Sequence, residues 1–231
     1  MNAEPRYNDT FYENTTNYSK IIDVICNTTT SLQDLPTPIN LKTLFRNANP
    51  VEIEVGFGKG RFLLEASRQN PEINYIGVER AQKYVEITHE RFEKYIRHYA
   101  IDKGSGIFKN VRLVWTDANY FLSRYVPEES IQAYHIYFPD PWPKARQQKR
   151  RIFRNKEFLS AIMKTLKSDD GKLYVVTDFA EYFNEIQERL AKWTNLQPSS
   201  EFVGYENIAT NFELKYQREG REIFRKLYKK A

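Results

Sequence analysis

Three acidic residues lie at the ends of three predicted strands, and a glycine-rich loop separates the first acid from the second. Glu54 ends the strand before the loop, Glu79 closes the next strand, and Asp117 closes the third. The loop, Glu-Val-Gly-Phe-Gly-Lys-Gly, holds its glycines at Gly56, Gly58 and Gly60. Glycine permits a tight turn and the close approach of a ligand to the backbone. An acid at the end of the second strand can accept hydrogen bonds from both ribose hydroxyls of an adenosine. These residues therefore predict a site for an adenosine-containing molecule.

The charge of Glu54 distinguishes two such molecules. NAD would bring a pyrophosphate to the helix that follows the glycines, and Glu54 would repel it. S-adenosylmethionine carries an ammonium and a sulfonium instead, and Glu54 would attract it. Lys59, inside the loop, opposes this preference only slightly. Asp117 is placed to meet the adenine amino group, although it could instead only cap the next helix.

The segment Phe-Pro-Asp-Pro-Trp-Pro-Lys-Ala-Arg-Gln-Gln-Lys-Arg-Arg (138–151) places one acid between two prolines, just before a dense run of positive charge. Pro139 and Pro141 fix their own φ angles, and Pro141 pushes Asp140 into an extended conformation. The acid is thereby held at the end of a fourth predicted strand, and the aromatic residues beside it offer flat surfaces for a base. A rigid turn with a buried tryptophan would explain the prolines, but not the basic run.

These residues depend on strands and helices that alternate from residue 51 onward. Strands are predicted at 51–55, 74–79, 110–117, 131–138 and 172–178, and helices at 59–70, 81–99, 118–126, 155–168 and 179–193. Two further strands are predicted at 201–205 and 222–228. This alternation predicts an α/β fold, in which a mostly parallel sheet has helices on both faces. Ligands bind such sheets at the carboxyl ends of the strands.

Six segments, taken together, resemble one enzyme family. EVGFGKG (54–60), GVE (77–79), TDA (116–118), FPDPWPKARQQKRR (138–151), TDF (177–179) and TNFE (210–213) occur in the order and spacing of the bacterial tRNA (guanine-N7)-methyltransferase family. The similarity runs from about residue 50 to the end, and the segment 138–151 is highly specific to this family. The resemblance implies the seven-stranded class I methyltransferase sheet, with S-adenosylmethionine as methyl donor. It also implies that the acceptor is a guanine in the variable loop of tRNA, at position 46.

The resemblance further implies a role for each matching residue. The donor-binding residues would be Glu54, Gly56, Gly58, Gly60, Glu79, Asp117 and Asp140. The substrate-binding residues would be Lys144, Asp178, Thr210, Asn211, Phe212 and Glu213, and the RNA-contacting residues Arg146, Lys149, Arg150 and Arg151. Asp140 is the predicted catalytic residue, because a carboxylate that accepts from the guanine's Watson–Crick edge would bind the transition state more tightly than the ground state. Without the resemblance, the spacings 178–181 and 210–213 would indicate helix capping boxes.

The first 45 residues differ in composition from the rest. They are polar and rich in Asn, Thr and Tyr, which predicts a weakly ordered arm with a short helix near Tyr18–Cys26. The methyltransferase domain is predicted to cover residues 46–231.

Three other functions fit parts of the pattern. A class I methyltransferase could act on another RNA or on a small molecule, but the basic run beside Asp140 disfavours a small molecule. An RNA-binding protein without catalysis would not need the acids at the strand ends. An NAD-dependent oxidoreductase is disfavoured by Glu54 and by the lack of an evident Tyr-x-x-x-Lys pair.

The composition limits the remaining possibilities. The 231 residues are 41% hydrophobic, which suits one α/β domain, and the net charge of +5 is compatible with a polyanionic partner. One cysteine, Cys26, and three dispersed histidines predict neither a disulfide nor a metal site. We expect a cytoplasmic protein with no membrane segment and no secretory signal. We also expect a monomer or homodimer that needs no other protein partner.

Overall fold

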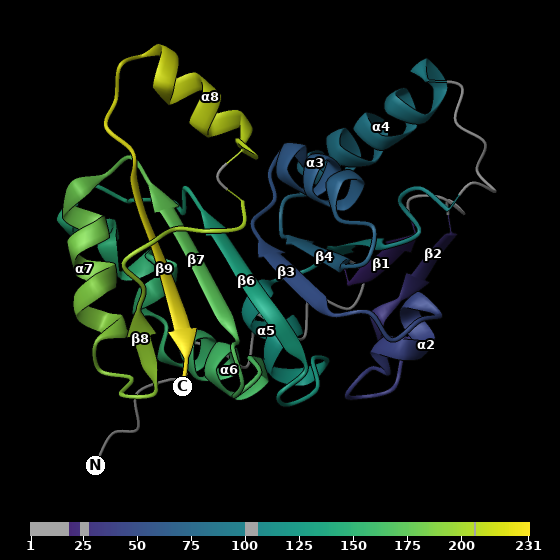
Figure 1. The fold of residues 1–231 in the computed structure, drawn as a ribbon, viewed down its shortest axis with the longest axis horizontal. Coiled ribbons are helices and arrows are strands. Elements are labelled where there is room, and N and C mark those ends of the chain that lie inside the picture. The colour runs from purple at the N-terminus through teal and green to yellow at the C-terminus, as the bar shows by residue number, and fades with distance from the viewer. Residues whose placement is uncertain (1–18, 24–27, 100–105, 206) are drawn as a thin grey trace.

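A nine-stranded sheet forms the centre of the computed structural model, which describes residues 19–23, 28–99, 106–205 and 207–231 (Figure 1). The strands lie in the order β2-β1-β5-β4-β3-β6-β7-β9-β8. Their bounds are β1 Lys20–Asp23, β2 Thr28–Ser31, β3 Val51–Val55, β4 Asn74–Glu79, β5 Val111–Trp115, β6 Ile131–Tyr137, β7 Lys172–Thr177, β8 Leu196–Pro198 and β9 Phe224–Lys230.

Strands β3 to β9 confirm the predicted seven-stranded, mostly parallel sheet. The neighbouring pairs among β3 to β7 are parallel, with β3 between β4 and β6. Strand β9 lies between β7 and β8 and is antiparallel to both. The nine-stranded total exceeds the prediction because β1 and β2 extend the sheet beyond β5.

Helices cover both faces of the sheet, as predicted. Because side chains alternate along a strand, Leu173 and Val175 of β7 pack in one core with α5, α6 and α7. Tyr174 and Val176 face the other core, which contains α3 and α4. The α-helices are α2 Leu41–Phe45, α3 Arg61–Gln69, α4 Gln82–His98, α5 Ala118–Arg124, α6 Lys156–Thr165, α7 Ala180–Leu190 and α8 Asn211–Arg218. Short 3-10 helices are η1 Leu32–Asp34, η3 Ala145–Arg150 and η4 Ile152–Arg154.

The short helix predicted near Tyr18–Cys26 is wrong for its described part, because Lys20–Asp23 forms β1. This strand pairs antiparallel with β5 and with β2, and Ile21 is buried in the core. Pairing satisfies the backbone groups that β5 would otherwise expose as an edge strand. Residues 1–18 and 24–27 of the predicted arm lie outside the described residues, and the division at residue 45 stays a prediction.

The strand predicted at 201–205 is also wrong, since the edge strand β8 lies earlier in the chain. The aromatic side chains of this segment face the core instead. Tyr205 is buried and donates a hydrogen bond to Glu52, and the hydroxyl of Tyr174 donates to the backbone carbonyl of Val203 at 2.9 Å. These contacts hold the segment over the α3–α4 face of the sheet rather than in its plane.

The parallel strands bring the predicted site residues to one edge. Glu54, Glu79 and Asp117 lie at or just beyond the carboxyl ends of β3, β4 and β5, and Asp140 follows β6. Helix α8 lies above the carboxyl ends of β6 and β7 (Figure 1). The fold therefore gathers residues from 54 to 218 in sequence around this edge.

Candidate active site

Glu54 is a buried carboxyl group, and one of its oxygens lacks a partner. The residue is 3% exposed, and its Oε2 makes no hydrogen bond within the described part of the chain. Burial, and then the negative charge of Glu79, raise the pKa of Glu54 well above its ordinary value. Because burying an unsatisfied polar group costs free energy, this oxygen indicates a place where a cation or another hydrogen-bond donor binds.

The glycine-rich loop is held against Glu79. Gly56, Gly58 and Gly60 all have left-handed φ angles, of +75°, +51° and +65°. The N–H of Gly58 donates to Glu79 Oε2 at 3.1 Å, and the N–H of Ala81 donates to Oε1 at 2.8 Å. Since each carboxylate oxygen has two lone pairs, Glu79 can still accept from the hydroxyls of a ligand.

Gly60 is also required for close packing between the loop and α4. A Cβ atom on Gly60 would lie 2.1 Å from Thr88 Cγ2, whereas a Cβ on Gly56 would meet nothing within 4 Å. We expect Gly60→Ala to lower the free energy of unfolding by about 2–5 kcal/mol, from overpacking added to left-handed strain. Gly56→Ala is the control, with a loss of about 1–2 kcal/mol from strain alone. Urea unfolding measures both, and equal losses would contradict the packing role of Gly60.

A cavity of about 110 Å³ lies between the glycine-rich loop and the start of α8. Six predicted site residues line it: Glu54, Gly56, Gly58, Thr210, Asn211 and Phe212. The remaining lining residues were not assigned to the site from the sequence: Phe57, Lys59, Arg61, Phe62, Tyr84, Tyr137 and Lys215. Glu79, Asp117 and Asp140 lie along the same edge of the sheet but outside this lining. The cavity thus joins the loop to the TNFE segment, which lies about 150 residues later in the chain.

A buried polar chain supports the cavity wall at Tyr137. The hydroxyl of Tyr137 lies 2.8 Å from His135 Nδ1, and His135 Nε2 lies 2.7 Å from Glu52 Oε2. In the neutral tautomer of His135 that donates from Nε2 to Glu52, Nδ1 accepts from the Tyr137 hydroxyl. The tyrosine oxygen therefore keeps its lone pairs for a ligand. A local signal exists in the sequence, since His135 and Tyr137 are two apart on β6 and share a face.

The backbone around Asp140 is strained on both sides. Phe138 and Trp142 have left-handed φ angles of 50° and 40°, although neither is glycine. The N–H of Phe138 donates to the carbonyl of Val176 at 2.7 Å, which ties this turn to β7. Asp140 itself is exposed. Strained, non-glycine backbone concentrates at functional sites, which supports a functional role for the loop that carries Asp140.

An aromatic cluster connects the Asp140 loop to α8. The ring of Phe138 lies 6.1 Å from that of Phe212 and 5.5 Å from that of Tyr216. Burial, and then negative charges that include Asp178 and Asp140, raise the pKa of Tyr216. Phe212 is 43% exposed and also lines the cavity beside Glu54. Helix α8 therefore forms a wall that the cavity and the Asp140 loop share.

Two of the three residues that could cap a helix, Asp117 and Thr210, do so, and Asp178 does not. Asp117 caps α5, because it accepts from the N–H of Tyr120 at 3.2 Å. Thr210 likewise caps α8 by accepting from the N–H of Glu213 at 3.0 Å. The side chain of Glu213 is buried and pairs with Arg225 instead of completing the box.

Asp178 does not cap α7. The residue at the N-cap position is Phe179, and Asp178 Oδ2 pairs with Arg221 Nη1 at 2.8 Å. The guanidinium of Arg221 also stacks on the ring of Tyr216, 4.3 Å from its centroid. This pair places Asp178 beside the aromatic cluster.

The basic run divides into exposed and buried residues. Lys144, Arg146, Lys149 and Arg150 are exposed, and the guanidinium of Arg150 lies 5.0 Å from the ring centroid of Trp142. Arg151 is 1% exposed. The predicted RNA contact of Arg151 is therefore not supported, because its guanidinium is enclosed by protein.

No helix in the described ranges is long and apolar enough to cross a membrane. The same ranges hold no group of three or more His, Cys, Asp or Glu side chains that could bind a metal ion.

Comparison with known sequences identifies the relatives of this chain. Residues 48–226 match a family described as putative methyltransferase. The chain is 34% identical over 194 residues to the tRNA (guanine-N(7)-)-methyltransferase of Actinobacillus pleuropneumoniae serotype 5b (strain L20), covering 81% of this chain and 72% of that protein. It is 33% identical over 204 residues to the protein of the same name from Streptococcus pneumoniae (strain 70585), covering 84% and 88%.

Comparison with solved structures bears on the fold alone. The 16S rRNA methyltransferase KamB superimposes with a TM-score of 0.58 at 13% identity, covering 92% of this chain and 99% of that one. The aminoglycoside resistance methyltransferase NpmB1 gives a TM-score of 0.55 at 14% identity, covering 92% and 100%. The sheet is thus that of the class I methyltransferases, and the sequence relatives show that the chain belongs to the tRNA (guanine-N7)-methyltransferase family.

Proposed function

We propose that this protein transfers a methyl group from S-adenosylmethionine to N7 of a guanine in tRNA, and that this guanine is at position 46 in the variable loop. The names of the curated relatives support methylation of guanine N7 in tRNA. One structural observation carries the site assignment. Phe212 of α8 lines the cavity that holds Glu54, and its ring also contacts Phe138 beside Asp140. The donor and acceptor sites would therefore share the aromatic cluster around Phe212, beside which the methyl group and the guanine would meet.

The residues around the cavity fit S-adenosylmethionine. The unpaired Oε2 of Glu54 would accept a hydrogen bond from the ammonium group of S-adenosylmethionine. The glycine-rich loop would lie against the amino-acid part of this donor. Glu79 would bind the ribose hydroxyls and Asp117 the adenine amino group, each while keeping its present hydrogen bonds. When bound, this donor supplies an electrophilic methyl group on a sulfonium. The site holds acids where the donor is cationic, which also disfavours NAD.

The acceptor side would need no strong base. Guanine N7 already presents a lone pair at the major-groove edge, so alignment alone can supply roughly 7–11 kcal/mol of the barrier. As the purine becomes positive, its Watson–Crick edge becomes a stronger hydrogen-bond donor. Asp140 would accept from that edge and thereby favour the transition state. Lys144, Asp178 and residues 210–213 would complete the acceptor pocket.

The exposed cations of the basic run would bind tRNA phosphates. We expect the triple variant Arg146→Ala, Lys149→Ala, Arg150→Ala to reduce the slope of log Kd against log salt by about 2–3, since each phosphate contact contributes roughly 0.7–0.9. Filter binding across a salt series measures this slope. A matched triple, Lys42→Ala, Lys164→Ala, Lys192→Ala, removes three exposed lysines from other elements. Equal slopes for the two triples would show that the basic run faces away from RNA.

The proposed reaction is tested by incubating the protein with S-adenosylmethionine labelled in its methyl group and an unmodified tRNA transcript. Digestion of the RNA to nucleosides should place the label in 7-methylguanosine. Label in any other nucleoside would overturn the acceptor atom. Transfer to other RNAs at the same rate would overturn the choice of tRNA.

A further inference from the structure

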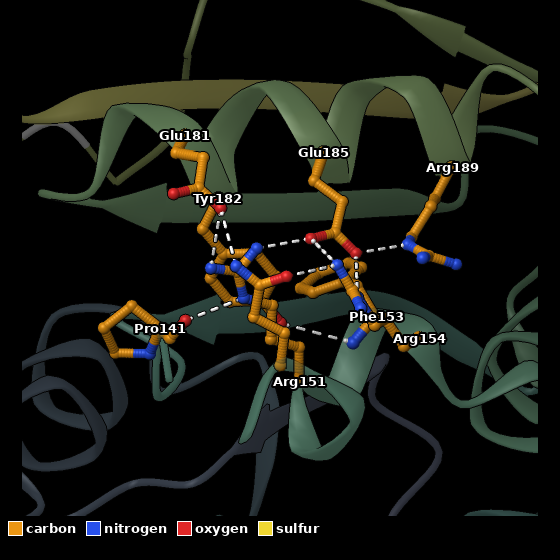
Figure 2. A network of polar contacts seen from close by, with 9 residues as sticks. Pro141, Arg151, Phe153, Arg154, Glu181, Tyr182, Glu185 and Arg189 are labelled. Carbon is orange, nitrogen blue, oxygen red and sulfur yellow. Dashed lines mark hydrogen bonds and ion pairs between the residues drawn. The ribbon is translucent and has the colours of Figure 1, made fainter. Parts of the chain in front are cut away.

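Arg151 is the most enclosed residue of the basic run, and each of its hydrogen bonds has a different acceptor (Figure 2). Its Nε donates to the carbonyl of Pro141 at 2.7 Å. Its Nη1 donates to Glu185 Oε2 at 2.5 Å and its Nη2 to Glu181 Oε1 at 3.0 Å. The guanidinium also lies 4.8 Å from the ring centroid of Tyr182. One planar group thus joins the loop 138–142 to helix α7.

The contact with Pro141 bears directly on Asp140, which precedes it in the chain. Prolines at 139, 141 and 143 supply no N–H groups, so neighbouring residues can hold this stretch mainly by donating to its carbonyls. Arg151 is such a donor. The left-handed φ angles of Phe138 and Trp142 persist only where surrounding contacts hold them.

Helix α7 provides a fixed base for this contact. Glu185 also accepts from Arg154 Nε at 2.5 Å and from Arg189 Nε at 2.7 Å. Burial alone would raise the pKa of Glu185, but hydrogen bonds from Arg154, Arg151 and Arg189 lower it to about 2. Glu185 is therefore ionised near neutral pH, and Figure 2 shows it between three guanidinium groups below α7.

We propose that Arg151 is a positioning residue, which holds the loop 138–142 so that Asp140 faces the guanine. The proposal rests on the proposed function insofar as Asp140 contacts that base. It assigns Arg151 a role distinct from that of its neighbour Arg150, which is exposed and available to phosphates. Two adjacent arginines would thus serve loop geometry and RNA affinity separately.

The first test compares Arg151→Lys with the matched variant Arg189→Lys. Arg189 shares the carboxylate of Glu185, whereas the hydrogen bond to the Pro141 carbonyl comes from Arg151. We expect Arg151→Lys to lower kcat at least about 10-fold, because small misplacements of a catalytic group are costly. The Kd for tRNA and its salt slope should stay at the wild-type values, and Arg189→Lys should keep kcat within about 2-fold. Wild-type kcat in Arg151→Lys, or a salt slope reduced by about one, would overturn the proposal.

A second readout follows the loop itself and needs no acceptor. Trp115→Phe and Trp193→Phe leave Trp142 as the only tryptophan. In this background, Arg151→Lys should lower the fluorescence anisotropy of Trp142 and increase its quenching by iodide, whereas Arg189→Lys should not. Unchanged anisotropy and quenching would overturn the positioning role even if the acceptor of the enzyme were not tRNA. If Arg151→Lys does not fold, Glu185→Gln replaces it, because this variant removes the charge that orients Arg151. Glu185→Gln should likewise lower kcat, lower the anisotropy of Trp142 and increase its quenching by iodide.

Discussion

Replacing Asp140 with asparagine is expected to lower kcat/KM on tRNA by about 100-fold or more, because the variant loses an acceptor that acts mainly in the transition state. Asparagine keeps the size of the side chain but replaces one carboxylate oxygen by an N–H donor. That N–H group would face the hydrogen-bond donors of the guanine's Watson–Crick edge and could not accept from them. The loss should therefore fall mainly on kcat rather than on the Kd for tRNA.

The affinity for S-adenosylmethionine separates this effect from donor binding. Asp140 is exposed and lies outside the lining of the cavity that contains Glu54. Glu79 and Asp117 also lie outside this lining, so the Kd for S-adenosylmethionine decides between the two roles predicted for Asp140. If Asp140 acts on the guanine, Asp140→Asn should keep this Kd within about 3-fold of the wild-type value, less than a lost hydrogen bond usually costs; a larger rise would assign Asp140 to donor binding. Asp169→Asn, an exposed change in the turn before β7, is the matched control for kinetics and calorimetry. Wild-type kcat/KM in Asp140→Asn would exclude Asp140 as the catalytic residue.

Glu54→Gln is expected to weaken donor binding and to stabilise the free protein. A hydrogen bond to a charged group contributes about 1.5–3 kcal/mol, so loss of the carboxylate should raise the Kd for S-adenosylmethionine roughly 10- to 100-fold. Without a ligand, the buried and unpaired carboxyl of Glu54 is a cost to the fold. A neutral amide removes the charged state that is costly to bury.

The effect of Glu54→Gln on stability should depend on pH in a defined direction. The pKa of Glu54 is raised in the folded state, first by burial and then by Glu79. Below the ordinary carboxyl pKa, Glu54 is protonated whether the chain is folded or unfolded, and the two proteins should be similarly stable. As the pH rises, ionisation in the unfolded state progressively destabilises the wild-type fold, until the folded pKa is passed. The Tm of Glu54→Gln should thus exceed that of the wild-type protein by more at pH 8 than at pH 4.

Calorimetry and thermal unfolding on the same preparations test both effects. Glu128→Gln, at an exposed carboxylate, is the control for a change of net charge. A Glu54→Gln variant that bound the donor as tightly as wild type would contradict the role of Glu54. A Tm of Glu54→Gln below that of the wild-type protein at pH 8 would contradict the destabilisation assigned to the buried carboxyl of Glu54.

Local patterns in the sequence predicted much of this fold and part of its site. The alternation of apolar strands with amphipathic helices gave β3 to β7 and α3 to α7, because each pattern reflects which face of an element is buried. The carboxyl ends of parallel strands meet at one edge, so the positions of Glu54, Glu79 and Asp117 followed from their places at or just beyond the ends of strands.

The errors concern contacts between distant segments. Arg150 and Arg151 are identical and adjacent, and contacts with distant residues of α7 (Glu181, Tyr182 and Glu185) make only Arg151 buried. Strand β1 forms because an edge at β5 is available to it, which no local pattern of 20–23 reveals. Likewise, Tyr137 belongs to the cavity because a chain through His135 to Glu52 holds it there. Tertiary context overrides local preference at all three places.

The most direct test of the central claim is the position of the methyl group in tRNA. Reduction followed by aniline cleaves RNA at 7-methylguanine, so the lengths of the fragments give the modified nucleotide. The proposal predicts one enzyme-dependent cleavage at position 46, absent when that guanine is replaced by adenine and when S-adenosylmethionine is omitted. Cleavage at another guanine, or persistence of cleavage after the replacement, would contradict the proposed acceptor.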